Sequence, residues 1–150
     1  MYADYSYYVD EFYGTAIDAA DFPRLAVRAS DFIDYYTKGK ARRVTDPYIL
    51  GILAKACCAL AEQMLIDEQS RQVSANALAS ALTSGTGAIK SESVGSWSAS
   101  YTTAADFISG FGSAKAYRAA YADIALQYLA STGLLYRGGC HVHSAHCNDL

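Results

Sequence analysis

Residues 45–69 read TDPYILGILAKACCALAEQMLIDEQ and carry the clearest helical pattern in the chain. The stretch opens with two residues that favour a helix cap, followed by Pro47 at the first helical position, where a missing N–H costs nothing. Apolar residues then recur at helical spacing. They are Ile49, Ile52, Leu53, Ala56, Leu60, Met64 and Leu65. We predict a central helix here, which at about 1.5 Å per residue would span roughly 35 Å, the width of a small domain.

The first half of this helix is apolar around most of its circumference. Cys57 and Cys58 widen the apolar stripe, and we interpret them as packing residues. Lys55 and Glu62 interrupt the apolar run, and both flanks are polar. A buried helix of a soluble protein is therefore expected instead of a membrane span.

The bulk composition is that of one globular domain. The chain has 150 residues, of which 52% are hydrophobic and 18% charged, values that argue against intrinsic disorder. The formal net charge is only −3, so no strong overall field attracts nucleic acid. Thirteen tyrosines stand out, because tyrosine offers a large contact area with a polar tip and suits partly wet protein contacts. The composition favours assembly over catalysis.

Two further helices are predicted, at residues 21–37 and 113–131. The first has Asp21 as its N-cap and Pro23 in its first turn, and the second is stopped by Gly133. Each has one apolar stripe that would face the central helix. The first stripe comprises Phe22, Leu25, Ala26, Ala29, Phe32, Ile33 and Tyr36, and the second Tyr117, Ala120, Tyr121, Ile124, Ala125, Tyr128 and Leu129.

Between the central and last helices, residues 70–114 read as a long connection. Residues 70–87 are small and polar, with a weak helical pattern that the sequence Ser84-Gly-Thr-Gly87 breaks. Residues 89–102 alternate apolar and polar residues, which predicts one or two short strands. The expected fold is mainly α, a small bundle of about three main helices with extended arms and one or two short β-strands. We expect one helical domain over residues 1–138 and a separate tail over 139–150.

Residues 1–20 form an aromatic arm without a clean period. One interpretation is an arm that folds back on its own core. The other is that its aromatic side chains, with two from the 70–114 connection, anchor a neighbouring subunit. These subunit-interface candidates are Tyr5, Tyr7, Tyr8, Phe12, Tyr13, Trp97 and Tyr101.

The connection 38–43 is basic, and its four candidates for contact with phosphates are Lys38, Lys40, Arg42 and Arg43. Such a run is usually a solvated loop, and contact with DNA phosphates in a channel is the alternative. A stand-alone DNA-binding domain is disfavoured, because the total charge is balanced and no helix is basic enough for recognition.

Several segments together resemble one family. They are YGTAI at 13–17, DFPRLAVRASDFID at 21–34, CALAEQ at 58–63, IKSESVGS at 89–96 and YLASTGLLYRG at 128–138. Their order and spacing over residues 2–138 resemble the head–tail connector (adaptor) proteins of tailed bacteriophages.

The resemblance implies a structural protein of the virion neck, made in the cytoplasm of the host bacterium. Such a protein forms a ring, usually a dodecamer, that docks on the portal protein, continues the DNA channel and presents a surface to the next neck, stopper or tail-completion protein. DNA would pass through without sequence recognition, and no membrane would be involved. The segment that reaches toward the portal would include Leu134, Leu135, Tyr136 and Arg137.

The tail offers a competing function. Cys140-His-Val-His-Ser-Ala-His-Cys147 holds all three histidines and two of the four cysteines, and these ligand types suit tetrahedral Zn²⁺. Candidate ligands are Cys140, His143, His146 and Cys147. The alternative to the connector function is thus a small cytoplasmic protein with a zinc-binding tail that acts as an interaction or regulatory module. A flexible tail that binds metal only adventitiously, or a Cys140–Cys147 disulfide, also fits the pattern.

Nothing in the sequence indicates an enzyme or a resident cofactor. All histidines lie in the tail, so a Ser–His or Cys–His pair would need that segment. No Gly-Lys-Ser/Thr follows the glycines near residue 110, so a phosphate-binding loop is not expected. The N-terminus has no basic region followed by an apolar run, so no signal peptide is expected, and a reducing compartment follows.

Overall fold

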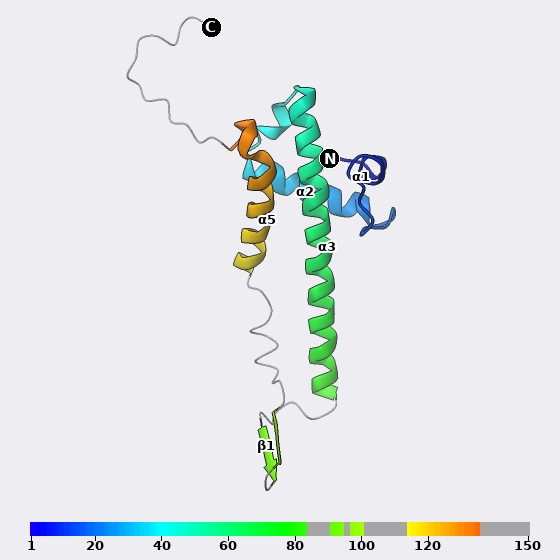
Figure 1. The fold of residues 1–150 in the computed structure, drawn as a ribbon, viewed down its shortest axis with the longest axis vertical. Helices are drawn as coiled ribbons and strands as arrows, with labels where there is room; N and C mark the ends of the chain where they lie inside the picture. Colours follow the sequence, from blue (N-terminus) through cyan, green and yellow to red (C-terminus); the bar gives the residue numbers. More distant parts are fainter. Residues whose placement is uncertain (84–90, 95–96, 101–113, 136–150) are drawn as a thin grey trace, which may run out of the picture.

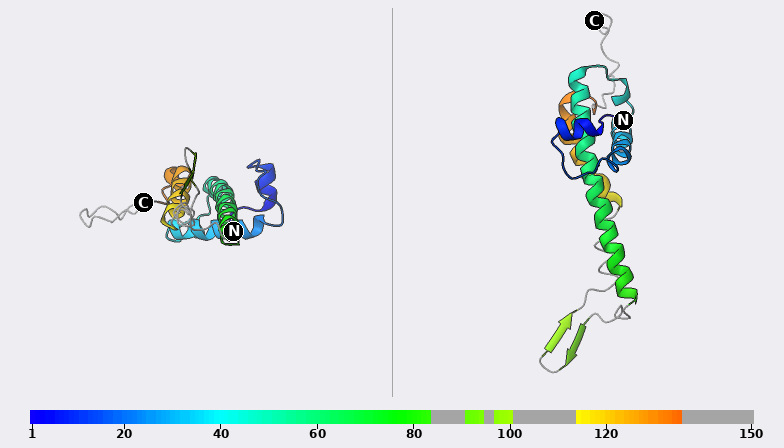
Figure 2. Two further views of the ribbon diagram at one scale, coloured as in Figure 1. Left: turned by 90° about the horizontal axis from the view of Figure 1, so that it is seen from below. Right: turned by 90° about the vertical axis from the view of Figure 1, so that its right-hand side faces the viewer.

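The computed structural model describes residues 1–83, 91–94, 97–100 and 114–135. This part of the chain is mainly helical and forms a small bundle, which confirms the predicted fold class. The helices are α1 (Tyr5–Asp10), α2 (Phe22–Tyr36), α3 (Pro47–Thr83) and α5 (Ala114–Leu129), with short 3₁₀ turns η1 (Ala41–Arg43) and η2 (Ala130–Thr132). Helix α3 is central: α2 crosses it, α1 lies on one side and α5 on the other (Figure 1). The same order is seen from below in Figure 2.

Helix α3 is longer than the sequence pattern suggested. It has 37 residues and runs to Thr83, so the expected boundary near Gln69 is wrong. The weak pattern after Gln69 continues the same helix, because no glycine or proline occurs there before Gly85. The predicted break at Ser84-Gly85 does coincide with the end of α3.

The first half of α3 is the core of the bundle. From Leu53 to Ala61 only Lys55 is exposed, and both Cys57 and Cys58 are fully buried. This half of α3 is apolar around most of its circumference because helices α1, α2 and α5 lie next to it on three sides (Figure 1). By length and apolar composition alone, residues 47–76 could also cross a membrane, a criterion that the buried helix of a soluble bundle meets as well.

Beyond the core, α3 emerges into solvent. Asp67 is its last buried side chain among those described, and from Glu68 to Asn76 every side chain is exposed or half-buried. Arg71 still contacts α5, lying 4.6 Å from the ring centre of Tyr117. The helix then continues to Thr83, past the end of α5 (Figure 1).

The start of α2 differs in detail from the prediction. The Asp21 side chain makes no capping hydrogen bond, because this residue is already in a helical conformation. The turn before it is closed by the backbone, with the Phe22 N–H donating to the carbonyl of Asp18 at 3.0 Å. The cap of α3 follows expectation, since Oδ1 of Asp46 accepts from the N–H of Tyr48 at 2.9 Å.

Two short strands follow α3, as the alternation over residues 89–102 predicted. Strands β1 (Ser91–Val94) and β2 (Trp97–Ser100) pair antiparallel, with Ser91 opposite Ser100 and Val94 opposite Trp97. Helix α5 then returns along α3 and buries Ala125 and Leu129. Gly133 ends this segment with a φ of +71°, the left-handed conformation expected of a helix stop.

Candidate assembly surfaces

The aromatic arm folds back on its own core. Tyr8, on α1, is fully buried, and its ring stacks on Phe22 of α2 with a centroid distance of 4.8 Å. The ring of Phe12 also stacks on the Tyr8 ring, with a centroid distance of 6.0 Å. Tyr8 is therefore wrong as a subunit-interface candidate, because its ring is already enclosed by this chain.

The hydroxyl of Tyr8 is satisfied on both sides. It donates to Oε1 of Glu62 on α3 at 2.7 Å and accepts from the backbone N–H groups of Ala16 and Ile17 at 2.9 and 3.2 Å. Burial, reinforced by the Glu62 carboxylate, raises the pKa of Tyr8 to about 12. One side chain thus fastens both α1 and the segment before α2 to the central helix.

The other aromatic candidates divide into packed and free side chains. Tyr5, Tyr7 and Phe12 are half-buried against the core, and the Tyr7 hydroxyl donates to the carbonyl of Gly51 at 3.3 Å. Tyr13 is 82% exposed and holds a φ of +58°, which is unusual for a bulky residue. Of the arm's candidates, Tyr13 alone presents a free ring. Trp97 begins β2, and Tyr101 lies outside the described residues.

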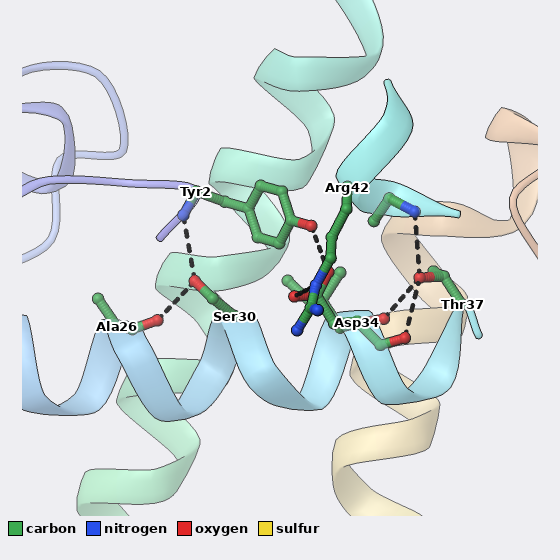
Figure 3. Close-up of polar contacts among 8 residues, drawn as sticks. Tyr2, Ala26, Ser30, Asp34, Thr37 and Arg42 are labelled. Carbon is green, nitrogen blue, oxygen red and sulfur yellow. Dashed lines mark hydrogen bonds and ion pairs between the residues drawn. The ribbon is translucent and has the colours of Figure 1, made fainter. Parts of the chain in front are cut away.

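A polar network fixes the chain start and the basic connection to α2 (Figure 3). The carboxylate of Asp34 accepts from the Tyr2 hydroxyl and, at 2.7 Å, from Nε of Arg42. The Tyr2 N–H donates to Oγ of Ser30 at 3.1 Å, and Ser30 in turn donates to the carbonyl of Ala26 at 2.7 Å. Burial and the Asp34 hydrogen bond raise the pKa of Tyr2, so its proton stays in the network at neutral pH.

The basic connection is consequently not a uniform cationic patch. Arg42 is paired with Asp34. Lys38, Lys40 and Arg43 are exposed. Lys38 and Gly39 hold φ values of +54° and +75°, which reverse the chain after α2. Phosphate contact by the remaining three stays a prediction.

Cys57 and Cys58 pack as predicted and are poorly placed for thiol chemistry. The Cys57 thiol donates to the carbonyl of Ala26 at 3.4 Å and lies 3.5 Å from Oγ of Ser30. Burial raises the pKa of both thiols, that of Cys58 to about 12. Both groups therefore remain protonated thiols at neutral pH.

This burial predicts slow thiol labelling. In a variant with Cys140 and Cys147 changed to serine, an aromatic disulfide reagent at pH 8 should react with Cys57 and Cys58 at least about 100-fold more slowly than in urea, because the folded state excludes the reagent and holds the thiols protonated. The absorbance of the released thiolate measures the rate. Rapid labelling of two thiols in the folded protein would contradict the packing of α3.

A groove of 660 Å³ lies on the α5 side of the bundle, between α2, α3 and α5. Its aromatic wall is formed by Phe32, Tyr36 and Tyr121: the Phe32 ring stacks on Tyr36 at 5.8 Å and meets Tyr121 edge-on at 5.5 Å. Met64 adds a buried apolar surface, and Tyr35, which also lines the groove, is 78% exposed. The volume lies in the range, about 300–1,000 Å³, that encloses a side-chain-sized or ligand-sized group.

Charged side chains frame this groove unevenly. Arg28 contacts Glu68 closely, and Arg24 donates to the same carboxylate at 2.9 Å, which lowers the pKa of Glu68. Arg118 of α5 is exposed and forms no hydrogen bond or ion pair within the described part of the chain. Among the described residues that line the groove, Arg118 is therefore the cation that can pair with a binding partner. The acidic residue of the lining, Asp31, lies on α2.

A carboxylate is buried next to Tyr121 of the groove wall. Asp67 is 5% exposed, and its Oδ1 accepts from Nε2 of Gln63 at 2.9 Å. Within the described residues its Oδ2 has no hydrogen-bond partner. Burial and the nearby Asp67 carboxylate raise the pKa of Tyr121.

The remaining candidates fall near or beyond the last described residue. Leu134 and Leu135 are half-buried and pack against the core of their own chain, so only part of each is open to a portal. Tyr136 and Arg137, and the candidate metal ligands Cys140, His143, His146 and Cys147, lie outside the described residues. Within the described residues, no group of three or more His, Cys, Asp or Glu side chains could hold a metal ion.

The sequence analysis did not identify the groove. Phe32, Tyr36 and Tyr121 were assigned to buried stripes, and the structure places them at the half-buried edge of those stripes. A usable signal was the pair of aromatic residues at positions i and i+4 of α2, beside unpaired arginine on α5, but only the crossing of the helices brings them together.

Comparison of the chain with protein-family models, curated proteins and solved structures found no match. The family resemblance of the sequence segments therefore stays a hypothesis.

Proposed function

We propose that this protein is a ring-forming structural component of a tailed-bacteriophage neck, an adaptor between the portal and the next neck or tail protein. The observation that carries the proposal is the emergence of α3 from the bundle. A helix segment without buried side chains is marginal in water on its own, and from Glu68 to Asn76 none is buried. Such an extension gains stability when neighbouring subunits cover it.

Exposed apolar residues where α3 leaves the core support this proposal. Ile66 and Val73 are 53% and 67% exposed and lie seven residues apart, which places them on one face of α3. Two exposed aliphatic side chains on one helix face suit contact with another protein chain. The β1–β2 hairpin beyond α3 adds a second projecting element (Figure 1).

On this proposal the partners are further copies of the chain, the portal protein and a downstream neck protein, and the location is the virion. DNA passes through the ring without being read, with the exposed residues Lys38, Lys40, Arg42 and Arg43 as the channel candidates. No catalytic role and no cofactor are proposed.

The test is assembly on a portal ring. Mass photometry of the purified protein, alone and with a candidate portal ring, should show a discrete ring of about twelve copies, or monomers that add to the portal as such a ring. The added mass should be unchanged by a zinc chelator. Failure to bind the portal, or assembly that depends on zinc, would overturn the proposal and favour a role for the Cys140–Cys147 segment.

A further inference from the structure

We infer that the α2–α5 groove of one copy binds the exposed end of the α1 segment of the next copy. The groove is the 660 Å³ hollow walled by Phe32, Tyr36 and Tyr121. The inserted segment, which we call the α1 hook, consists of Val9, Asp10, Glu11 and Tyr13. This inference rests on the proposed ring and names the contact that builds it.

The positions of the two surfaces fit a head-to-tail contact. Helix α1 lies on one side of α3 and helix α5 on the other, in both Figure 1 and Figure 2. The hook includes the last residues of α1, and the groove is lined by residues of α2, α3 and α5. A contact between two different faces of identical subunits repeats from copy to copy and closes a ring when the rotation allows. A groove and a hook on the same side would instead favour a two-fold dimer.

The hook is exposed in a way that the fold does not explain. Val9 is 41% exposed and Tyr13 82%, so two apolar groups stand in solvent within one short segment. Tyr13 keeps its left-handed φ of +58° because the chain is held on both sides of it. The Gly14 N–H donates to the carbonyl of Tyr8 at 2.8 Å, and the Phe12 N–H donates to that of Tyr7 at 3.0 Å. The backbone that carries the Tyr13 ring is therefore held in place.

The charges of the α1 hook and of the groove are complementary. Glu11 is exposed and makes no side-chain hydrogen bond or ion pair in the described part of the chain, and the same holds for Arg118 beside the groove. Two unpaired charges of opposite sign on the facing surfaces steer and align association. Tyr13 beside three aromatic rings supplies the buried anchor that interface hot spots require. The occupant is thus a second copy of this chain.

A charge exchange tests the contact. Sedimentation velocity over a range of concentrations, alone and with the portal ring, should show that Arg118→Glu and Glu11→Arg each weaken association between copies roughly tenfold or more. The double variant Glu11→Arg with Arg118→Glu should recover most of the loss, because the pair is restored with its signs reversed. Tyr13→Ala should also weaken association between copies. Adding the double charge exchange to Tyr13→Ala should not recover this loss, because the aromatic anchor is still missing.

A matched control is Lys55→Glu, which reverses an exposed charge outside both surfaces and should leave association unchanged. Thermal unfolding of each variant shows that the fold is kept. Association that ignores both single reversals, or a double variant that recovers nothing, overturns the contact. Portal binding is measured separately. An oligomer that depends on these charges but never binds the portal overturns the adaptor function and supports the contact. A portal-bound ring that is unaffected by the charge reversals supports the adaptor function and overturns the contact.

Discussion

Replacing Tyr8 by alanine is expected to lower the free energy of unfolding by about 3–5 kcal/mol, the range for deleting a large buried aromatic side chain. The ring is fully buried and stacks on Phe22 and Phe12. Its loss also leaves the carboxylate of Glu62 without the hydroxyl that binds it. Urea denaturation followed by circular dichroism measures the change.

Two companion variants separate packing from hydrogen bonding at this position. Tyr8→Phe keeps the ring and should cost about 1–3 kcal/mol, the penalty for leaving buried polar partners unsatisfied. Tyr13→Ala removes a tyrosine that is 82% exposed and should change stability by less than about 0.5 kcal/mol. Equal effects of Tyr8→Ala and Tyr13→Ala would mean that the arm does not fold back on its own core.

Replacing Gly14 by alanine is expected to destabilise the protein by at least about 1–3 kcal/mol, the usual cost of overpacking. A Cβ atom at Gly14 would lie 2.0 Å from Cε2 of Tyr8, closer than any van der Waals contact allows. The ring cannot move away easily, because its hydroxyl is held by Glu62 and by two backbone N–H groups. The same urea titration reports the loss.

A double-mutant cycle shows whether the Tyr8 ring is the cause. In a Tyr8→Ala background the added methyl of Gly14→Ala has room, so it should cost less than about 0.5 kcal/mol. Gly51→Ala is the matched control: a Cβ there meets nothing within 4 Å, and alanine inside a helix should stabilise by about 0.5–1 kcal/mol. Additive effects of the Gly14 and Tyr8 changes would contradict the geometry.

The local features of the sequence were sufficient to predict the bundle. The helical spacing of residues 45–69 marked the core helix, and Gly133 and the Ser84-Gly85 pair marked two ends, because glycine and periodic apolar residues act locally. The central helix was cut short for a related reason: once α3 leaves the core its residues no longer need an apolar stripe, so periodicity stops before the helix does.

The assembly surfaces were less accessible to sequence analysis. Helix α1 has six residues, too few for a period to emerge, and the sequence did not distinguish a buried Tyr8 from an exposed Tyr13. The difference arises from a tertiary contact, the close approach of Gly14 to the Tyr8 ring. The groove likewise depends on how α2 crosses α3 and α5, which no single segment of sequence contains.

The emergence of α3 from the core after Asp67 also makes the protein adjustable in length. Each residue in the extension adds about 1.5 Å of reach and turns whatever follows by about 100°. Removing or adding seven residues there would change the reach by about 10.5 Å while rotating the distal end by only about 20°. Because no described side chain from Glu68 to Asn76 is buried, such a change leaves the buried core intact and costs at most the surface contacts of Glu68 with α2 and of Arg71 with α5. The length of the extension can therefore change by two helical turns at a time, through insertion or deletion of seven residues, while the core of the bundle stays the same.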